Sequence, residues 1–121
     1  MSIIDGNANA IVQNTYGLAP LVNSLLNVSA VGPGTALDGQ ITRANASATF
    51  TTSAGTTAGA CQLFGSLDGV NYVALGSPVT TATASTTFTQ VVQNCFMRYV
   101  RAQVTTTITG GTVSASVGLS G

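Results

Sequence analysis

The chain has no histidine, lysine, glutamate or tryptophan, and its 121 residues include only three arginines and three aspartates. Charged residues make up 5% of the sequence, where about 25% is usual in globular domains. Without histidine, a Ser-His or Cys-His catalytic pair cannot form, and the usual replacement bases, lysine and glutamate, are also missing. We therefore expect a protein that is not an enzyme and has no catalytic residues.

The shortage of charge also argues against several ligands. A nucleic-acid surface needs clustered basic residues to neutralise phosphates, and only Arg43, Arg98 and Arg101 are present. No apolar run approaches the roughly 18 residues that span a bilayer, and the first ten residues lack the basic region of a signal peptide. We expect no nucleic-acid or membrane partner, and synthesis inside the cell.

Metal ligands are equally scarce. Cys61 and Cys95 cannot complete a tetrahedral zinc site without histidine. The segment DGNANA at residues 5–10 begins like a calcium loop, but Ala10 stands where glycine is required and Tyr16 where an acid is required. We predict no metal and no cofactor. The two cysteines are expected to be small buried side chains, although the sequence leaves open whether they form a disulfide.

The residues that are abundant favour a sheet. Hydrophobic residues make up 45% of the chain and are interspersed with Ser, Thr and Asn instead of Lys and Glu. A chain of this length forms one domain with a single core. Since so little charge is available to keep copies apart in solution, we expect much of the surface to be covered by other chains or attached to a large assembly.

Every aspartate is followed by glycine, which is typical of turns. Asp68-Gly69 separates residues 60–66 from residues 70–76 and predicts a β-hairpin. Asp38-Gly39 and Gly110-Gly111 are predicted to be turns as well. We interpret these six residues as structural, and a ligand or catalytic role for Asp68 as the weaker alternative.

Further strand candidates are residues 41–53, 84–93, 95–107 and 112–119. In the last one, four apolar residues share one face and hydroxylated residues share the other. In the preceding one, Val100, Ala102 and Val104 share a face with Phe96. The spacing predicts an antiparallel β-sandwich. Whether its strand order is jelly-roll or immunoglobulin-like stays open.

Residues 1–31 do not share this pattern, and we predict an extended N-terminal arm followed by a β-sandwich domain over residues 32–121. The arm is a candidate for contact with a neighbouring subunit. A short helix, or a first strand preceded by a loose terminus, are the alternatives.

Four residues are candidates for an interface: Tyr72, Tyr99, Arg98 and Arg101. The two arginines are three residues apart on one strand and therefore point to opposite faces. Arg101 is placed to face a partner's carboxylates, while Arg98 is placed to pair with an aspartate at a turn. The alternative use of the tyrosines, together with Asn71, is a carbohydrate-binding face.

The segments LFGSLDGVNYVALG and MRYVRAQVTTTITGGTVSASV resemble a family of small virion proteins of tailed bacteriophages and prophages. The resemblance covers roughly residues 34–119. Its motifs are Gly65, Ser66, Asp68 and Gly69, then Tyr72 where the family more often has Trp, then residues 98–101 and the Gly110-Gly111 turn.

The resemblance implies a structural component of a virion. We expect a capsid decoration (cement) protein, a homo-oligomer and specifically a homotrimer, that binds the major capsid protein on the outer capsid surface and is made in the host cytoplasm. The alternatives are a head-fibre or tail/baseplate accessory protein, or a carbohydrate-binding adhesin module.

Overall fold

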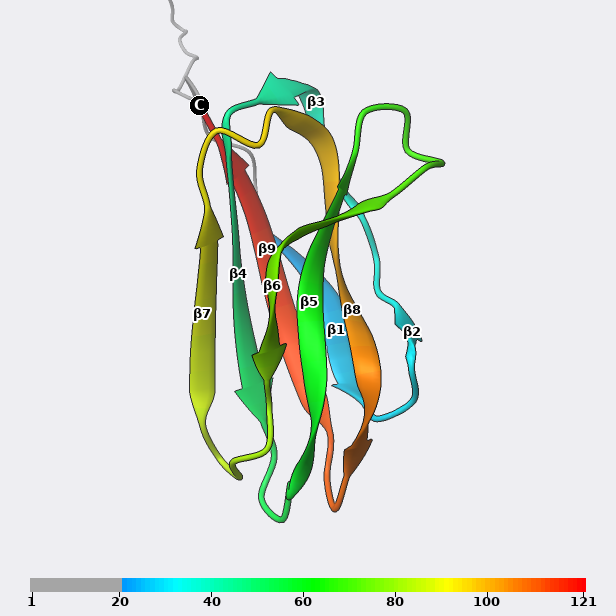
Figure 1. Ribbon diagram of the computed structural model, residues 1–121, viewed down its shortest axis with the longest axis vertical. Coiled ribbons are helices and arrows are strands. Elements are labelled where there is room, and N and C mark those ends of the chain that lie inside the picture. Colours follow the sequence, from blue (N-terminus) through cyan, green and yellow to red (C-terminus); the bar gives the residue numbers. More distant parts are fainter. Residues whose placement is uncertain (1–20) are drawn as a thin grey trace, which may run out of the picture.

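The computed structural model describes residues 21–121, which form nine β-strands and no helix (Figure 1). The strands are β1 (Val22–Val28), β2 (Gly32–Pro33), β3 (Leu37–Arg43), β4 (Asn45–Thr52), β5 (Ala58–Ser66), β6 (Val73–Thr80), β7 (Thr87–Val92), β8 (Met97–Thr109) and β9 (Val113–Ser120).

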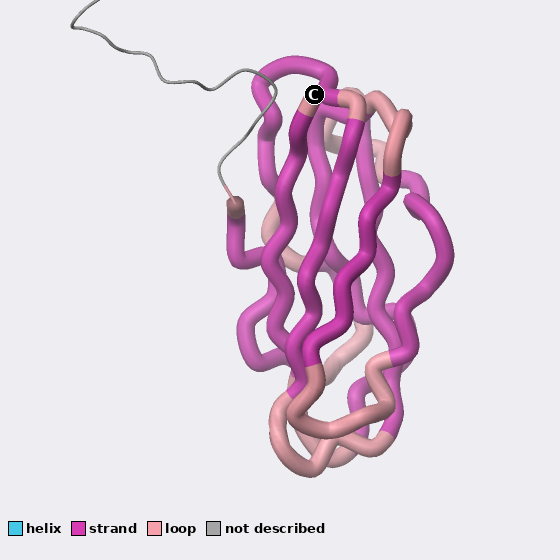
Figure 2. Tube along the Cα trace, turned by 90° about the vertical axis from the view of Figure 1, so that its left-hand side faces the viewer, coloured by secondary structure: helices cyan, strands magenta, loops and turns pink. Residues whose placement is uncertain are grey.

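These strands form two antiparallel sheets, so the predicted all-β sandwich is confirmed. One sheet has the order β1-β9-β4-β7, and the other has the order β2-β8-β5-β6 with β3 also paired to β8. Figure 2 shows the strands running along the long axis, with the connections gathered at the two ends. Most connections cross from one sheet to the other, and the predicted hairpin of β5 and β6 stays within one sheet.

The core lies between the sheets and follows the alternation in the sequence. Every second residue of β9 is buried, as is every second residue of β8 from Val100 to Val104. The largest fully buried side chains are Phe50 of β4 and Leu63 of β5. At roughly 25 cal/mol per Å² of buried apolar surface, this core is the main favourable contribution to folding.

Phe96 does not join this core, which corrects the prediction made from its spacing. The residue precedes β8, has a φ of 52° and is 56% exposed. The backbone N–H of the neighbouring Cys95 donates to the carbonyl of Ala44 at 2.8 Å. This bond fixes the loop before β8, so the strand alternation does not extend back to Phe96.

The predicted strand over residues 41–53 is also wrong in part, because the chain changes sheets within it. Arg43 ends β3, which pairs with β8, and Asn45 begins β4, which pairs with β9 and β7. Ala44 lies at the bend, where its carbonyl accepts the bond from the loop before β8. One apolar-containing run thus supplies strands to both layers.

The predicted boundary between arm and sandwich needs a correction as well. Residues 22–28 form β1, which pairs with β9 from Val22 opposite Val117 to Val28 opposite Val113. The sandwich therefore begins before residue 32 and includes the first strand that one alternative anticipated. Residues 1–20, to which the rest of the arm prediction applies, lie outside the described residues.

Side-chain hydrogen bonds connect the two sheets on both sides of the sandwich. On one side, the Ser24 hydroxyl of β1 accepts from the N–H of Ala102 in β8 at 2.9 Å. On the other side, Gln90 Nε2 of β7 donates to the carbonyl of Ser77 in β6 at 2.7 Å. The first bond joins the edge strand β1 to β8 of the other sheet, and the second joins the two edge strands β7 and β6.

Candidate interaction surface

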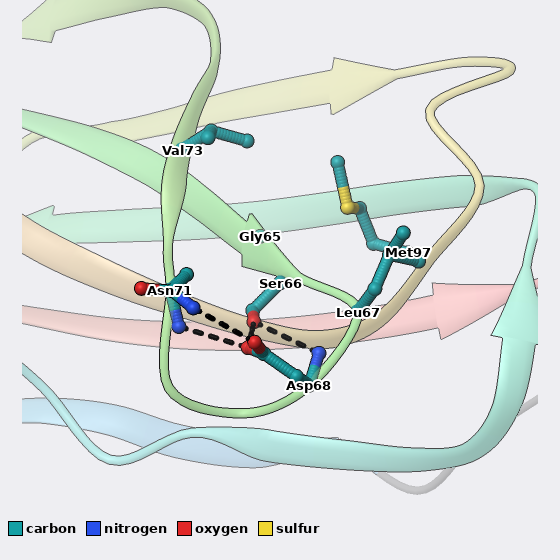
Figure 3. A pocket seen from close by; sticks show the side chains of 7 residues that line it. All are labelled: Gly65, Ser66, Leu67, Asp68, Asn71, Val73 and Met97. Carbon is teal, nitrogen blue, oxygen red and sulfur yellow. Dashed lines mark hydrogen bonds between the residues drawn. The ribbon is translucent and has the colours of Figure 1, made fainter.

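The loop between β5 and β6 is organised by the carboxylate of Asp68 (Figure 3). Its Oδ1 accepts from the backbone N–H groups of Val70 and Asn71 and from the hydroxyl of Ser66, each at 2.8 Å. Its Oδ2 accepts from the Asn71 side-chain amide at 2.8 Å. Such bonds from one aspartate to the following backbone are typical of a turn.

These bonds hold the pKa of Asp68 well below its ordinary value of 3.8, because each of them favours the charged carboxylate. The backbone N–H of Asn71 makes the largest contribution, followed by that of Val70. A carboxylate that accepts four bonds from its own loop is a poor base. The arrangement is that of a structural turn residue.

Gly69 completes the turn for a backbone reason. Its φ is 79°, in the left-handed region that side chains other than glycine rarely adopt. A Cβ atom at this position would also come within 3.3 Å of the Tyr99 ring. The loop therefore lies directly against Tyr99 of β8, which places the β5–β6 loop beside the start of that strand.

Asp38 and Arg98 form an ion pair at the same end of β8. Arg98 Nε donates to Asp38 Oδ1 at 3.0 Å, and a second guanidinium nitrogen donates to Oδ2 at 3.3 Å. The Arg98 hydrogen bond is the main reason that the pKa of Asp38 lies below its ordinary value, and the N–H of Gln40 adds to it. Arg98 thus takes the aspartate partner that its place at a strand end suggested.

Asp38 and Gly39 do not form a simple Asp-Gly turn, since both lie within β3. The left-handed residue is Gln40, with a φ of 68°. Gly39 is buried, and a Cβ there would come within 2.8 Å of Leu119. Close packing, not a positive φ, requires glycine at this position.

Tyr72 and Arg101 are brought together from the loop and from β8. The Arg101 guanidinium carbon lies 3.7 Å from the centroid of the Tyr72 ring, which is a cation–π contact. Arg101 Nε also donates to Gln103 Oε1 at 2.9 Å. Removal from water raises the pKa of Tyr72, and the nearby positive charge of Arg101 partly offsets this effect.

The four candidate interface residues therefore lie together at the start of β8 and on the β5–β6 loop, which packs against it. Tyr72 and Arg101 are stacked, and the Arg98 guanidinium lies 5.0 Å from the centroid of the Tyr99 ring. The Gly110-Gly111 pair is not part of this group. It lies between β8 and β9 at the other end of the sandwich, where Gly110 has a φ of 82°.

A shallow pocket of about 250 Å³ lies beside the β5–β6 loop, as Figure 3 shows. Leu67, Val73 and Met97 provide apolar walls, and the absence of a side chain at Gly65 lets Met97 pack closely, since a Cβ there would come within 2.7 Å of it. The Asp68 oxygens in this pocket are already bonded within the loop. The pocket thus offers a mainly apolar surface.

No sequence pattern predicted the environment of Arg43, which is 9% exposed at the end of β3. Its Nε donates to the Gly39 carbonyl at 2.9 Å. The two cysteines are free thiols: Cys61 is buried and Cys95 is half-buried. Desolvation raises the pKa of Cys61 to about 11, so this thiol stays protonated at neutral pH.

Two further properties concern only the part of the chain from residue 21 onward. No three His, Cys, Asp or Glu side chains there come together as they would around a metal ion. The same part contains no helix of the length and hydropathy needed to cross a membrane.

Solved structures with the same fold include two proteins with low sequence identity. The SPBc2 prophage-derived protein YomS matches with a TM-score of 0.58 and 12% identity, over 92% of this chain and 100% of YomS. The PBSX exported protein XepA matches with a TM-score of 0.60 and 12% identity, over 82% of this chain but 36% of XepA. No protein-family model and no curated protein matches the chain. The chain therefore shares its fold with YomS and with a part of XepA.

Proposed function

We propose that this protein is a structural, non-catalytic component of a bacteriophage virion, and more specifically a capsid decoration protein that binds the assembled head as a homotrimer. The main support is the fold, which the prophage-derived protein YomS shares over its entire length. The motifs that resemble small phage virion proteins fall on structural parts of this fold, namely the β5–β6 loop and β8.

Exposed apolar side chains support a role in binding another protein. Figure 1 places β3, the β5–β6 loop and the β7–β8 loop at one end of the sandwich. Of the large exposed apolar residues, Ile41, Leu67, Val70 and Phe96 lie on these segments and Val73 begins β6 next to the loop. The others lie on or near β1 and on β7: Leu21, Leu26, Val31 and Val91. Apolar residues gathered at one end of a nearly uncharged protein are typical of a surface that another protein covers.

Decoration would act by mass action. A protein that binds only the assembled shell stabilises it by RT ln(1 + [L]/Kd) at each site. Gln90 of the edge strand β7 already donates to backbone carbonyls of the edge strand β6, so strand addition is disfavoured on that side and binding would use the loops and the sheet faces. The carbohydrate-binding alternative is disfavoured, since a sugar stacks on an open aromatic face and Arg101 already covers one face of Tyr72.

The test is light scattering on the purified chain, followed by sedimentation with empty capsids of the source phage. We expect a discrete mass three times the 12.0 kDa chain and co-sedimentation at a fixed ratio to the shell protein. A tagged copy that labels the tail in negative-stain images, with capsids left unbound, would contradict decoration. It would reassign the protein to a tail or baseplate position.

A further inference from the structure

The outer face of the sheet that contains β8 carries a compact group of aromatic and polar side chains. Val100 and Ala102 point into the core, so Tyr99, Arg101 and Gln103 point outward. Phe64 of β5 lies opposite Arg101 in the strand register. With Tyr72 stacked on Arg101, these form what we call the Arg101 patch, consisting of Phe64, Tyr72, Tyr99, Arg101 and Gln103.

The guanidinium of Arg101 is held in place before any partner binds. The Tyr72 ring supports one of its faces at 3.7 Å, and Gln103 accepts the Nε–H at 2.9 Å. Neither of its two terminal nitrogens donates to another residue of the described chain. A planar group that is already oriented loses less side-chain entropy on binding, and its two terminal nitrogens match the two oxygens of a carboxylate.

The described chain has no carboxylate side chain left for this arginine. Of the two aspartates in residues 21–121, Asp38 is paired with Arg98, and Asp68 is bonded within its own loop. Residues 21–121 of a second copy would bring the same two engaged aspartates, and the one other aspartate of the sequence, Asp5, lies outside the described residues. Charge complementarity therefore favours a different protein as the partner of Arg101.

We propose that the Arg101 patch binds an aspartate or glutamate side chain of the capsid shell protein, through both terminal nitrogens of Arg101. The identity of the partner rests on the proposed function. Tyr and Arg are the residue types that dominate binding energy in protein interfaces. In the patch, the aromatic rings of Phe64, Tyr72 and Tyr99 exclude water around the charged pair, which strengthens it.

The test compares Arg101→Gln with Thr49→Ala in sedimentation with empty capsids of the source phage. Thr49 is exposed on β4, which belongs to the other sheet, and it lies outside the Arg101 patch. We expect Arg101→Gln to weaken capsid binding by about tenfold or more, and Thr49→Ala by less than about threefold. Arg101→Lys, which keeps the charge but loses the planar fork, should bind as weakly as Arg101→Gln.

The salt dependence of binding gives a second readout. Binding of the natural chain should weaken as the NaCl concentration rises, because salt screens the charged pair, and binding of Arg101→Gln should respond less. Thermal melting of each variant checks that the sandwich still folds. If the melting temperature of Arg101→Gln is lowered, the capsid affinity of Arg101→Lys tests the proposal in its place.

Each of the remaining outcomes would contradict one particular part of the proposal. Equal binding by the natural chain and Arg101→Gln would remove the Arg101 patch from the interface and leave the decoration function in place. Failure of the natural chain to bind capsids would overturn both the decoration function and the partner named here. A change in oligomer mass on Arg101→Gln, with capsid affinity unchanged, would show that the patch binds a second copy instead of the shell.

Discussion

Ser24 of β1 and Ala102 of β8 join the two sheets of the sandwich through one buried hydrogen bond of 2.9 Å. The same Ser24 hydroxyl donates to the carbonyl of Thr35 at 2.7 Å. Ser24 reaches across because the pairing of β1 with β9 shifts register between Asn23 and Leu25. This bulge turns Ser24 and Leu25, which are neighbours in sequence, both into the interior.

Ser24→Ala should lower the free energy of unfolding by about 1–3 kcal/mol, because the N–H of Ala102 loses its partner in a buried position. Urea denaturation measures this change. Ser29→Ala is the matched control, since Ser29 is exposed just beyond β1. A loss of similar size in both variants would mean that the bond between the sheets contributes little.

Leu63→Ala should lower the free energy of unfolding by about 2–5 kcal/mol, since Leu63 is fully buried and its removal leaves a cavity. Leu67→Ala is the control, because Leu67 lies four residues later in the loop and is 63% exposed. The control should change stability by less than about 0.5 kcal/mol. Equal effects in urea denaturation would contradict the placement of the core between β5 and the opposite sheet.

Asp68→Asn should destabilise the protein at neutral pH, and the difference from the natural chain should shrink in acid. The folded pKa of Asp68 lies below its unfolded value of 3.8, so the carboxylate stabilises the fold at pH values above 3.8. This contribution is lost as the pH falls through the folded pKa. Denaturation of both proteins at a series of pH values from about 7 to 2 measures it. A difference that stays constant with pH would show that the charge of Asp68 does not support the loop.

Cys61 should resist alkylation in the folded protein, while the half-buried Cys95 reacts first. Burial raises the pKa of Cys61 to about 11, and only the thiolate form is reactive. Mass spectrometry after iodoacetamide treatment at neutral pH should find one modified site in buffer and two in denaturant. Cys95→Ser is the informative variant: rapid modification of its remaining thiol without denaturant would contradict the burial of Cys61.

Local pattern was sufficient for most of the strands. The alternation of Val113, Ala115, Val117 and Leu119 with hydroxylated residues predicted β9 correctly, because side chains of a strand alternate between its two faces. The Asp68-Gly69 pair predicted the β5–β6 hairpin for a similar local reason. An aspartate that bonds the next backbone N–H groups and a glycine with positive φ form a turn without help from distant residues.

The sequence failed where a residue's conformation depends on a distant segment. Ala44 looks like the middle of a strand, but contact with the loop before β8 makes it the point where the chain changes sheets. Phe96 fits the apolar alternation, yet the same contact holds it outside the core. Gly39 follows an aspartate, as in a turn, but glycine is required there because a side chain would clash with Leu119.

The sequence by itself determined the all-β class, the hairpin and the turn role of Asp68, because these depend on the alternation of neighbours and on hydrogen bonds within a few residues. Only the tertiary structure decided how the strands are ordered and which groups meet on the surface. Arg101 and Tyr72 are 29 positions apart in the sequence, and the pairing of β5 with β8 brings them into contact. Likewise, only in the folded chain does Arg98 pair with Asp38 and does the loop bind Asp68. These contacts leave Arg101 without a carboxylate side chain among the described residues.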